Sequence, residues 1–171
     1  MRVLATLVIV VFLNIGQAIA EDSITYDAEQ KALDYMALTY ASGKGHIVLV
    51  KGLLARGAPV NAPTFSPDSF TDAEYLASEF GTPLQVAAEA GHTDIVKLLL
   101  DHDANTEWQC CDGGTALYFA AENGHLEAVK VLVEGGAKLL VFPSPLFAAM
   151  KGGHKDVVDY LSGSTPTEDD P

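Results

Sequence analysis

The chain has 171 residues, of which 49% are hydrophobic, and its 23 acidic and 10 basic side chains give a formal net charge of −13 at pH 7. This length suits a single domain with a hydrophobic core of its own. The strong negative charge repels nucleic acids and anionic lipid headgroups, so it argues against either as a partner and favours proteins with basic surfaces.

The N-terminus has the composition of a secretory signal. An apolar run extends from Val3 to Ile15, and Ala18 and Ala20 form the small-x-small pattern of a signal-peptidase site. The run is shorter than the roughly 20 residues that a membrane-spanning helix needs. We therefore expect cleavage between Ala20 and Glu21 during export to the periplasm or the outside of the cell, leaving no membrane segment. An uncleaved N-terminal anchor is the alternative.

The remainder of the chain repeats one block four times. Each copy has a Gly-His pair followed by an apolar helical pattern: GHIVLVKGLL from Gly45, GHTDIVKLLL from Gly91, GHLEAVKVLV from Gly124 and GHKDVVDYL from Gly153. A second block precedes each pair, as in GTPLQVAAEAGH from Gly81 and GTALYFAAENGH from Gly114. Each copy therefore predicts two helices joined by a glycine.

The second copy shows how the helices begin and pack. Thr82 is placed to cap the first helix, with Pro83 at its first position, where the missing N–H costs nothing. The second helix is expected to turn four apolar side chains inward: Ile95, Val96, Leu98 and Leu99. A single helix pair cannot bury its apolar face alone, but stacked copies can, so the repeats are expected to form one another's core.

These blocks resemble the ankyrin repeat. The matching residues of the second copy are Thr82-Pro83-Leu84, Ala87-Ala88, Gly91-His92, Ile95-Val96 and Leu98-Leu99, and those of the third are Thr115, Leu117, Ala120-Ala121, Gly124-His125, Val129 and Leu132. The resemblance implies an all-α solenoid of about four helix-turn-helix repeats within residues 21–163. The expected repeats cover about 30–61, 81–113, 114–142 and 143–163.

Three features depart from the family pattern. Residues 62–80 form an insertion whose last ten residues predict a short helix, either packed on the solenoid or gripping a partner. Residues 164–171 predict a disordered acidic tail. The family usually has His after Thr-Pro-Leu, where neighbouring turns are joined. This chain has Thr39, Gln85, Tyr118 and Phe147 in that slot, so aromatic packing is expected to substitute in the last two repeats.

The four repeated histidines do not predict a metal site. His46, His92, His125 and His154 occupy one equivalent position each, and stacked helices lie about 8–10 Å apart. Zinc needs its ligand nitrogens about 2 Å from one ion. We expect these side chains to form hydrogen bonds at the start of each second helix, and we expect no cofactor.

The only two cysteines, Cys110 and Cys111, are adjacent. An exported chain meets an oxidising compartment, but neighbouring cysteines can bridge only through a strained ring. A free or loosely paired structural role, a vicinal disulfide and intermolecular pairing all stay open.

Side chains that vary between repeats are the candidates for partner binding, because recognition by a solenoid usually lies where the copies differ. The turn WQCCDGG contains the only tryptophan, a residue type enriched at binding hot spots. Packing over the next repeat is the alternative role for that ring. The candidates are Trp108, Cys111, Asp112, Tyr75 and the first-helix residues Glu89, Glu122, Asn123 and Lys151.

No nucleophile motif, phosphate loop or metal spacing is present, so we expect a non-enzymatic, monomeric module that binds another protein. The hypotheses are a periplasmic inhibitor or immunity protein, an accessory protein of a resident enzyme, and a secreted effector acting on host proteins. An enzyme with an unrecognised site is the alternative from another class.

Overall fold

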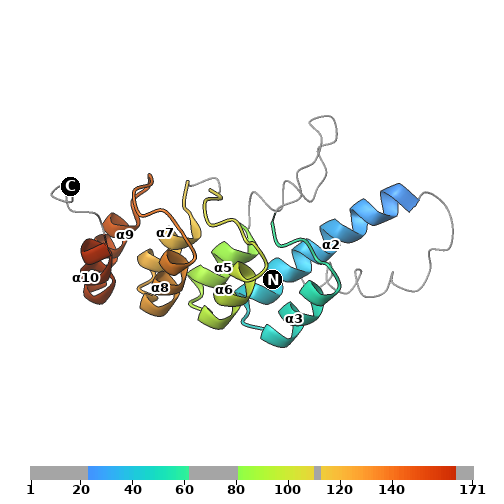
Figure 1. Ribbon diagram of the computed structural model, residues 1–171, viewed down its shortest axis with the longest axis horizontal. Helices are drawn as coiled ribbons and strands as arrows, with labels where there is room; N and C mark the ends of the chain where they lie inside the picture. Colours follow the sequence, from blue (N-terminus) through green and yellow to red (C-terminus); the bar gives the residue numbers. More distant parts are fainter. Residues whose placement is uncertain (1–22, 62–80, 110–112, 165–171) are drawn as a thin grey trace, which may run out of the picture.

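The computed structural model describes residues 23–61, 81–109 and 113–164, and the regular structure in these ranges is helical (Figure 1). The eight helices are α2 (Ser23–Gly43), α3 (Ile47–Ala55), α5 (Pro83–Glu89), α6 (Thr93–Leu100), α7 (Ala116–Glu122), α8 (Leu126–Glu134), α9 (Pro145–Gly152) and α10 (Lys155–Ser164). They pair in chain order, and each pair packs on the next along one axis. The expected all-α solenoid of four helix pairs is confirmed.

Several predictions concern residues outside the described ranges. These are the cleavage site between Ala20 and Glu21, the helix expected at the end of the 62–80 insertion, the Cys110–Cys111 pair, and residues 165–171 of the acidic tail. Ser164, the first residue of the predicted tail, is instead the last residue of α10. Within the described residues, no helix combines the length and the hydrophobicity needed to cross a membrane.

The first helices of the last three pairs each begin with a capping side chain, as the sequence predicts for Thr82. The side chain of Thr82 accepts a hydrogen bond from the backbone N–H of Gln85 at 3.2 Å, and Gln85 Oε1 accepts one from the Thr82 N–H at 2.8 Å. This reciprocal pair is a capping box, which satisfies two N–H groups that the helix itself leaves free. Thr115 and Ser144 cap α7 and α9 with their hydroxyl oxygens.

The core is a continuous row of small and branched apolar side chains between the helix layers. Its fully buried members include Leu84, Ala87, Ala88, Ile95, Val96, Leu99, Leu117, Ala120, Ala121, Val129 and Leu132. Alanines on the first helices let the neighbouring helix pair approach closely. Leu98 is only partly buried, which corrects the expectation that it points fully inward alongside Leu99.

The first pair differs from the others in the length of its first helix. α2 has 21 residues, whereas α5 and α7 have 7 each. Residues 23–42 contain neither glycine nor proline, so nothing in this stretch stops the helix before Gly43. α2 therefore extends beyond the helix pairs (Figure 1).

Successive repeats are joined by a histidine ring that lies over a glycine. The Nε2 atoms of His125 and His154 lie 2.9 Å from the backbone oxygens of Glu89 and Glu122, each at the end of the preceding first helix. The sequence predicted hydrogen bonding by these residues, but at the start of their own helices. The bonds instead cross to the preceding repeat, and His125 makes no side-chain cap bond to α8.

The glycine under each ring has no room for a side chain. A methyl group on Gly91 would lie 2.6 Å from Nδ1 of His125, and one on Gly45 would lie 2.7 Å from Cε1 of His92. Gly91 also has a φ of +72°, in the left-handed region that disfavours other residues. The Gly-His pair therefore ends one helix and supports the ring of the next repeat.

Replacing Gly91 with alanine tests this contact. The left-handed backbone alone costs about 1–2 kcal/mol, and displacement of His125 adds a further penalty of about 2 kcal/mol. Gly136→Ala is the matched control, because Gly136 has a φ of +87° but nothing within 4 Å of an added methyl group. Urea unfolding should show the larger loss for Gly91→Ala, and His125→Ala should reduce the difference. Equal losses for the two glycines would contradict the packing role of the ring.

A buried tyrosine on α2 predicts a second stability effect. Tyr35 is 2% exposed, its hydroxyl finds no hydrogen-bond partner in the described residues, and burial raises its pKa to about 12. The phenol of an unfolded chain loses its proton near pH 10. Between these two pH values the unfolded state is the one that ionises, so stability falls as the pH rises.

Tyr35→Phe should remove this alkaline loss of stability. At pH 7 the variant should be as stable as the parent chain, or more stable by up to about 1–2 kcal/mol, because it removes an unpaired buried hydroxyl. Urea unfolding at pH 7 and at about pH 11 measures both effects. A variant that is clearly less stable at pH 7 would show that the hydroxyl has a partner.

Candidate protein-binding surface

Asn61 links the turn after the first repeat to the turn after the second. Its Nδ2 donates to the backbone oxygen of Asp103 at 2.9 Å, and its Oδ1 accepts from the N–H of Asn105 at 2.7 Å. Asp103 has a φ of +62°, a conformation that aspartate tolerates better than most residues. One amide side chain therefore holds two turns in register.

Gln85 links α5 to the same projecting segment. Beyond its capping bond, its Nε2 donates to the backbone oxygens of Trp108 at 3.1 Å and Gly114 at 2.8 Å. Gln85 is 3% exposed, so its hydrogen bonds are shielded from solvent. It stands where the family usually has His, and it joins neighbouring turns as that position is expected to do.

The second and third turns are joined at two points. The Glu107 carboxylate accepts from the Lys138 N–H at 3.0 Å and lies 3.7 Å from Nζ of Lys138, while Gln109 Nε2 donates to the Phe142 oxygen at 2.9 Å. The turns therefore form one connected edge along the solenoid.

Tyr118 and Phe147 stand where the family usually has His, and of these two only Tyr118 makes an aromatic contact with another described residue. Tyr118 stacks edge-on against Phe119, with ring centres 5.5 Å apart, and its hydroxyl donates to Glu122 at 3.2 Å. Phe147 is 67% exposed, so the prediction that it packs between turns is wrong. No further repeat in the described residues lies over α9, which leaves this ring without a neighbour.

Of the predicted binding residues, Trp108 lies in the connected edge and is half-buried. Its backbone oxygen is held by Gln85, which itself lies one helical turn before Glu89 on α5. Gln85 and Glu89 lie about 6 Å apart along the axis of α5, because four residues of an α-helix rise by that distance. The Trp108 backbone therefore lies near the start of α5 and Glu89 lies at its end. Cys111, Asp112 and Tyr75 lie outside the described residues.

The other candidates lie at the ends of the first helices. Glu89, Asn123 and Lys151 are exposed, and Glu122 is half-buried against Tyr118. The backbone oxygens of Glu89 and Glu122 accept the hydrogen bonds of the histidine rings. Glu89, Glu122 and Lys151 occupy one equivalent position on successive first helices, and Asn123 follows that position in the third repeat. Sequence reasoning missed Asn61, Glu107 and Gln109, because their partners lie in irregular turns.

The charge is unevenly distributed along the solenoid. Residues 30–61 contain four basic side chains and one acidic side chain: Lys31, Lys44, Lys51, Arg56 and Asp34. Residues 81–109 contain five acidic side chains and one basic side chain: Glu89, Asp94, Asp101, Asp103, Glu107 and Lys97. The acidic field of the described residues is therefore strongest at the second repeat.

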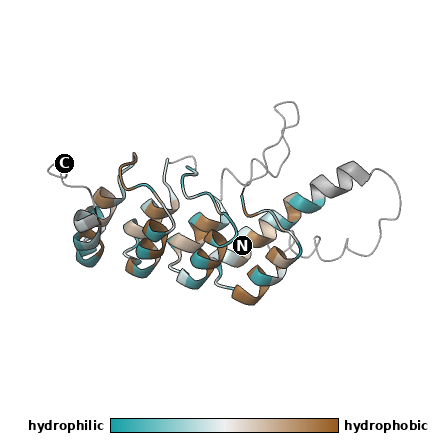
Figure 2. Ribbon diagram, viewed as in Figure 1, coloured by the Kyte–Doolittle hydropathy of each residue, from teal (hydrophilic) through white to brown (hydrophobic). Residues whose placement is uncertain are grey.

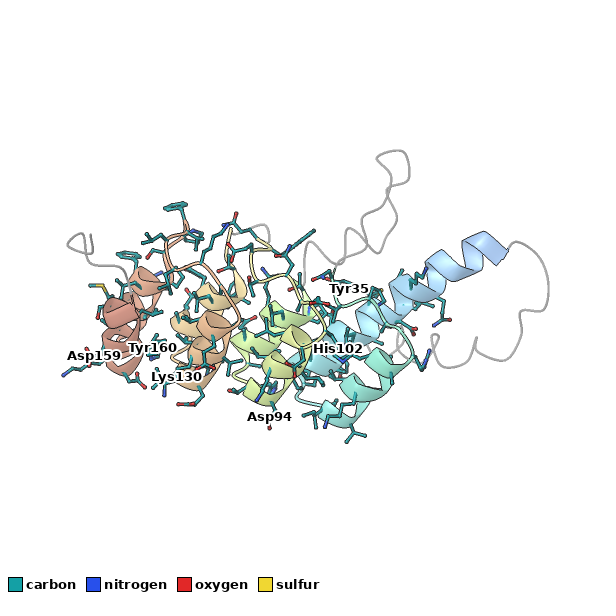
Figure 3. All side chains as sticks on the ribbon, viewed as in Figure 1. Tyr35, Asp94, His102, Lys130, Asp159 and Tyr160 are labelled. Atoms are coloured by element: carbon teal, nitrogen blue, oxygen red, sulfur yellow. The ribbon has the colours of Figure 1, made fainter. Side chains whose placement is uncertain are left out.

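The outer helices also carry charge, in a more balanced form. Asp94, Lys130 and Asp159 lie along the outer row formed by α6, α8 and α10 (Figure 3). Lys130 pairs with Glu127 at 2.7 Å, and this hydrogen bond raises the pKa of Lys130 above its ordinary value. Such an exposed pair contributes little to stability.

Metal-ligating clusters and surface hollows are the features of the described residues that bear on catalysis. The described residues contain no group of three or more His, Cys, Asp or Glu side chains placed to hold a metal ion. A hollow of about 580 Å³ beside α3 is an open depression, lined by Gly45, His46, Ile47, Val48, Leu49 and Gly52. Its lining has one titratable side chain and no paired acid and base.

Comparison with known proteins agrees with this architecture. A family model described as ankyrin repeats in three copies matches residues 67–143, which is less than half of the chain. The human ASB11 ankyrin repeat domain has a similar solved structure, with a TM-score of 0.63 and 27% sequence identity. The match covers 78% of this chain and spans 56% of that domain. No curated protein sequence matches the chain.

Residues 67–143 thus match ankyrin repeats, and the described residues adopt the fold of an ankyrin-repeat solenoid. This fold is typically a non-catalytic scaffold that mediates contacts between proteins.

Gln85→Ala tests how firmly the turn edge is held. The variant leaves the Thr82 N–H and the Gly114 oxygen without their partner, so it should lose about 2–3 kcal/mol in urea unfolding. The emission of Trp108, the only tryptophan, should shift to longer wavelength because its turn loosens. Gln109→Ala is the matched control, since an exposed glutamine that donates one bond should cost less than about 1 kcal/mol. Similar costs for both variants would show that Gln85 does not organise the turn.

Proposed function

We propose that this protein is exported and binds another protein through its turn edge and the ends of its first helices. The partner presents a basic patch to the second and third repeats. Binding blocks or supports an enzyme, and the chain itself carries out no reaction.

The observation that carries this proposal is an acidic row on a constant frame, formed by the exposed Glu89 and the half-buried Glu122. Glu89 and Glu122 occupy equivalent positions on α5 and α7, and Gly-His contacts hold the two helices at a set spacing. A pair of carboxylates on neighbouring helices suits two basic side chains about 10 Å apart. Trp108 lies at the other end of α5, where it supplies an aromatic contact beside the charged one.

Export is proposed from the signal-like first twenty residues. An inhibitor of a toxic enzyme and an accessory protein of a resident enzyme both need an exported binding module of this kind. They differ in what the partner does once bound, so identifying the partner separates them.

The first experiment is affinity capture from the native host. The full chain, tagged at its C-terminus and expressed with its own N-terminal segment, is captured at low and high salt, and co-purifying proteins are identified by mass spectrometry. We expect one basic protein that is lost at high salt, because screening weakens charge attraction. The partner's activity with and without the chain then separates inhibition from support. If the chain instead captured only proteins of another organism on which the native host acts, the effector hypothesis would be favoured.

Glu89→Lys with Glu122→Lys should weaken binding of that partner by about 10-fold or more, mainly through slower association. The control is Glu134→Lys with Glu127→Lys, which changes the net charge equally but on α8. Trp108→Ala should weaken binding through faster dissociation. If the control variant lost as much affinity as the test variant, the long-range field would account for binding and the acidic row would not.

A further inference from the structure

Within the described residues, nothing covers the face of the fourth repeat that points away from the third, and large apolar side chains lie on it. Phe147 is equivalent to Gln85 and Tyr118, and Gln85 faces the next repeat because it bonds to Gly114. Met150 lies three residues beyond Phe147 and so shares its side of α9. These two positions therefore lie on the face where a following repeat would stack.

Exposure at equivalent positions shows how the last repeat differs. Ala88 and Ala121, equivalent to Met150, are 0% exposed, whereas Met150 is 59% exposed. The loop before α9 adds Leu140 at 81% and Phe142 at 90%. Hydrophobic residues mark this loop and α9 at the end of the solenoid (Figure 2). Terminal repeats usually carry a polar outer face, because nothing covers it.

Two occupants of this face are disfavoured. The segment after α10, Thr165 to Pro171, has no large apolar side chain to cover Phe147 and Met150. A helix pair stacked as elsewhere in the solenoid needs alanine at the position of Met150, since close approach depends on small side chains there.

The charges of the fourth repeat favour a second copy of this chain. Residues 144–163 contain two lysines and two aspartates, all exposed, so the helix pair of the fourth repeat is itself neutral, although the chain carries a net charge of −13. A surface with equal numbers of positive and negative side chains can pair with a second copy of itself across a two-fold axis. Lys151 and Lys155 of one copy can face Asp156 and Asp159 of the other.

The apolar area is sufficient for such a contact. At about 200 Å² for a fully exposed side chain of this size, the four apolar residues present about 600 Å² per copy. Two copies would bury about 1,200 Å², the lower end of the range for specific interfaces.

We propose that two copies of this chain associate through their fourth repeats, with Phe147 and Met150 of one copy packed against those of the other. The contact is symmetric and closed, so it produces a dimer and not a filament. It replaces the monomer expected from the sequence. Because Leu140 and Phe142 of the third turn lie in the contact, it leaves the second turn and the acidic row free for a different protein. It rests on the fold and does not depend on the proposed function.

Sedimentation velocity of the purified full-chain product, at about 1 to 300 μM, tests the dimer. We expect monomer and dimer in exchange, with a dimer fraction that rises with salt, because screening reduces repulsion between two acidic copies. Capture of a basic partner should respond to salt in the opposite direction, so the two associations are distinguishable.

Phe147→Glu and Met150→Lys should each raise the dimer dissociation constant at least about tenfold, as expected for central apolar contacts. Both side chains are exposed, and a glutamate early in a helix and a lysine late in one are favourable, so folding is retained. Circular dichroism checks this. Val48→Glu is the control, since Val48 is 83% exposed on α3 at the other end of the solenoid.

Charge exchange provides a second test. Lys151→Asp with Lys155→Asp makes the face wholly acidic, and Asp156→Lys with Asp159→Lys makes it wholly basic. Each variant alone should be monomeric, and an equimolar mixture should recover the dimer.

Three results would overturn the proposal. One is a parent chain that stays monomeric over the whole concentration range, which would assign the face to a different protein. Another is loss of the dimer in Val48→Glu. The third is association that continues past the dimer, which would indicate head-to-tail stacking.

Discussion

The stacking of this solenoid depends on the contact between a histidine ring and the glycine of the preceding repeat. His125 and His154 lie over Gly91 and Gly124, and each ring is hydrogen-bonded at 2.9 Å to a backbone oxygen of the preceding first helix. Because the ring occupies the space of a side chain, only glycine fits beneath it. The same glycine adopts the positive φ that ends the first helix. One dipeptide therefore sets the helix length and the distance between repeats. The turns, which this contact does not constrain, are free to differ and to carry recognition.

Much of the fold can be predicted from the chain, because its determinants are local. Thr82 and Pro83 mark the start of α5, and Gly91 marks its end, without reference to any distant residue. The bonds of Gln85 to the Trp108 and Gly114 oxygens could not be predicted, since those partners lie 23 and 29 residues away in irregular backbone. The exposure of Phe147 was missed for a different reason. It occupies the same slot as Tyr118, and the two differ in whether another repeat lies over them, which residue type does not reveal.

The distribution of charge along the solenoid also could not be predicted from the overall composition. A net charge of −13 suggests an acidic surface throughout, yet residues 30–61 are mainly basic and residues 144–163 are balanced. The acidic side chains of the described residues are concentrated in the second repeat, beside Trp108 and the ordered turns. Charge and rigidity therefore occur together at the centre of the solenoid. Residues 30–61 and 144–163 have few acidic side chains and several exposed large apolar ones, so these two repeats and the second repeat are suited to different contacts.

Stacking between neighbours also shapes how the chain reaches its folded state. The main contacts of every helix are with its own partner and with the adjoining pair, so residues that touch are close in sequence. Such low contact order shortens the loops that must close and favours rapid folding. The second and third repeats have neighbours on both sides and the capping bonds of Thr82 and Thr115, so they are the natural nucleus. Folding would then spread outward one helix pair at a time. The fourth repeat, stabilised from one side, would join last and open first, and amide exchange would be fastest there.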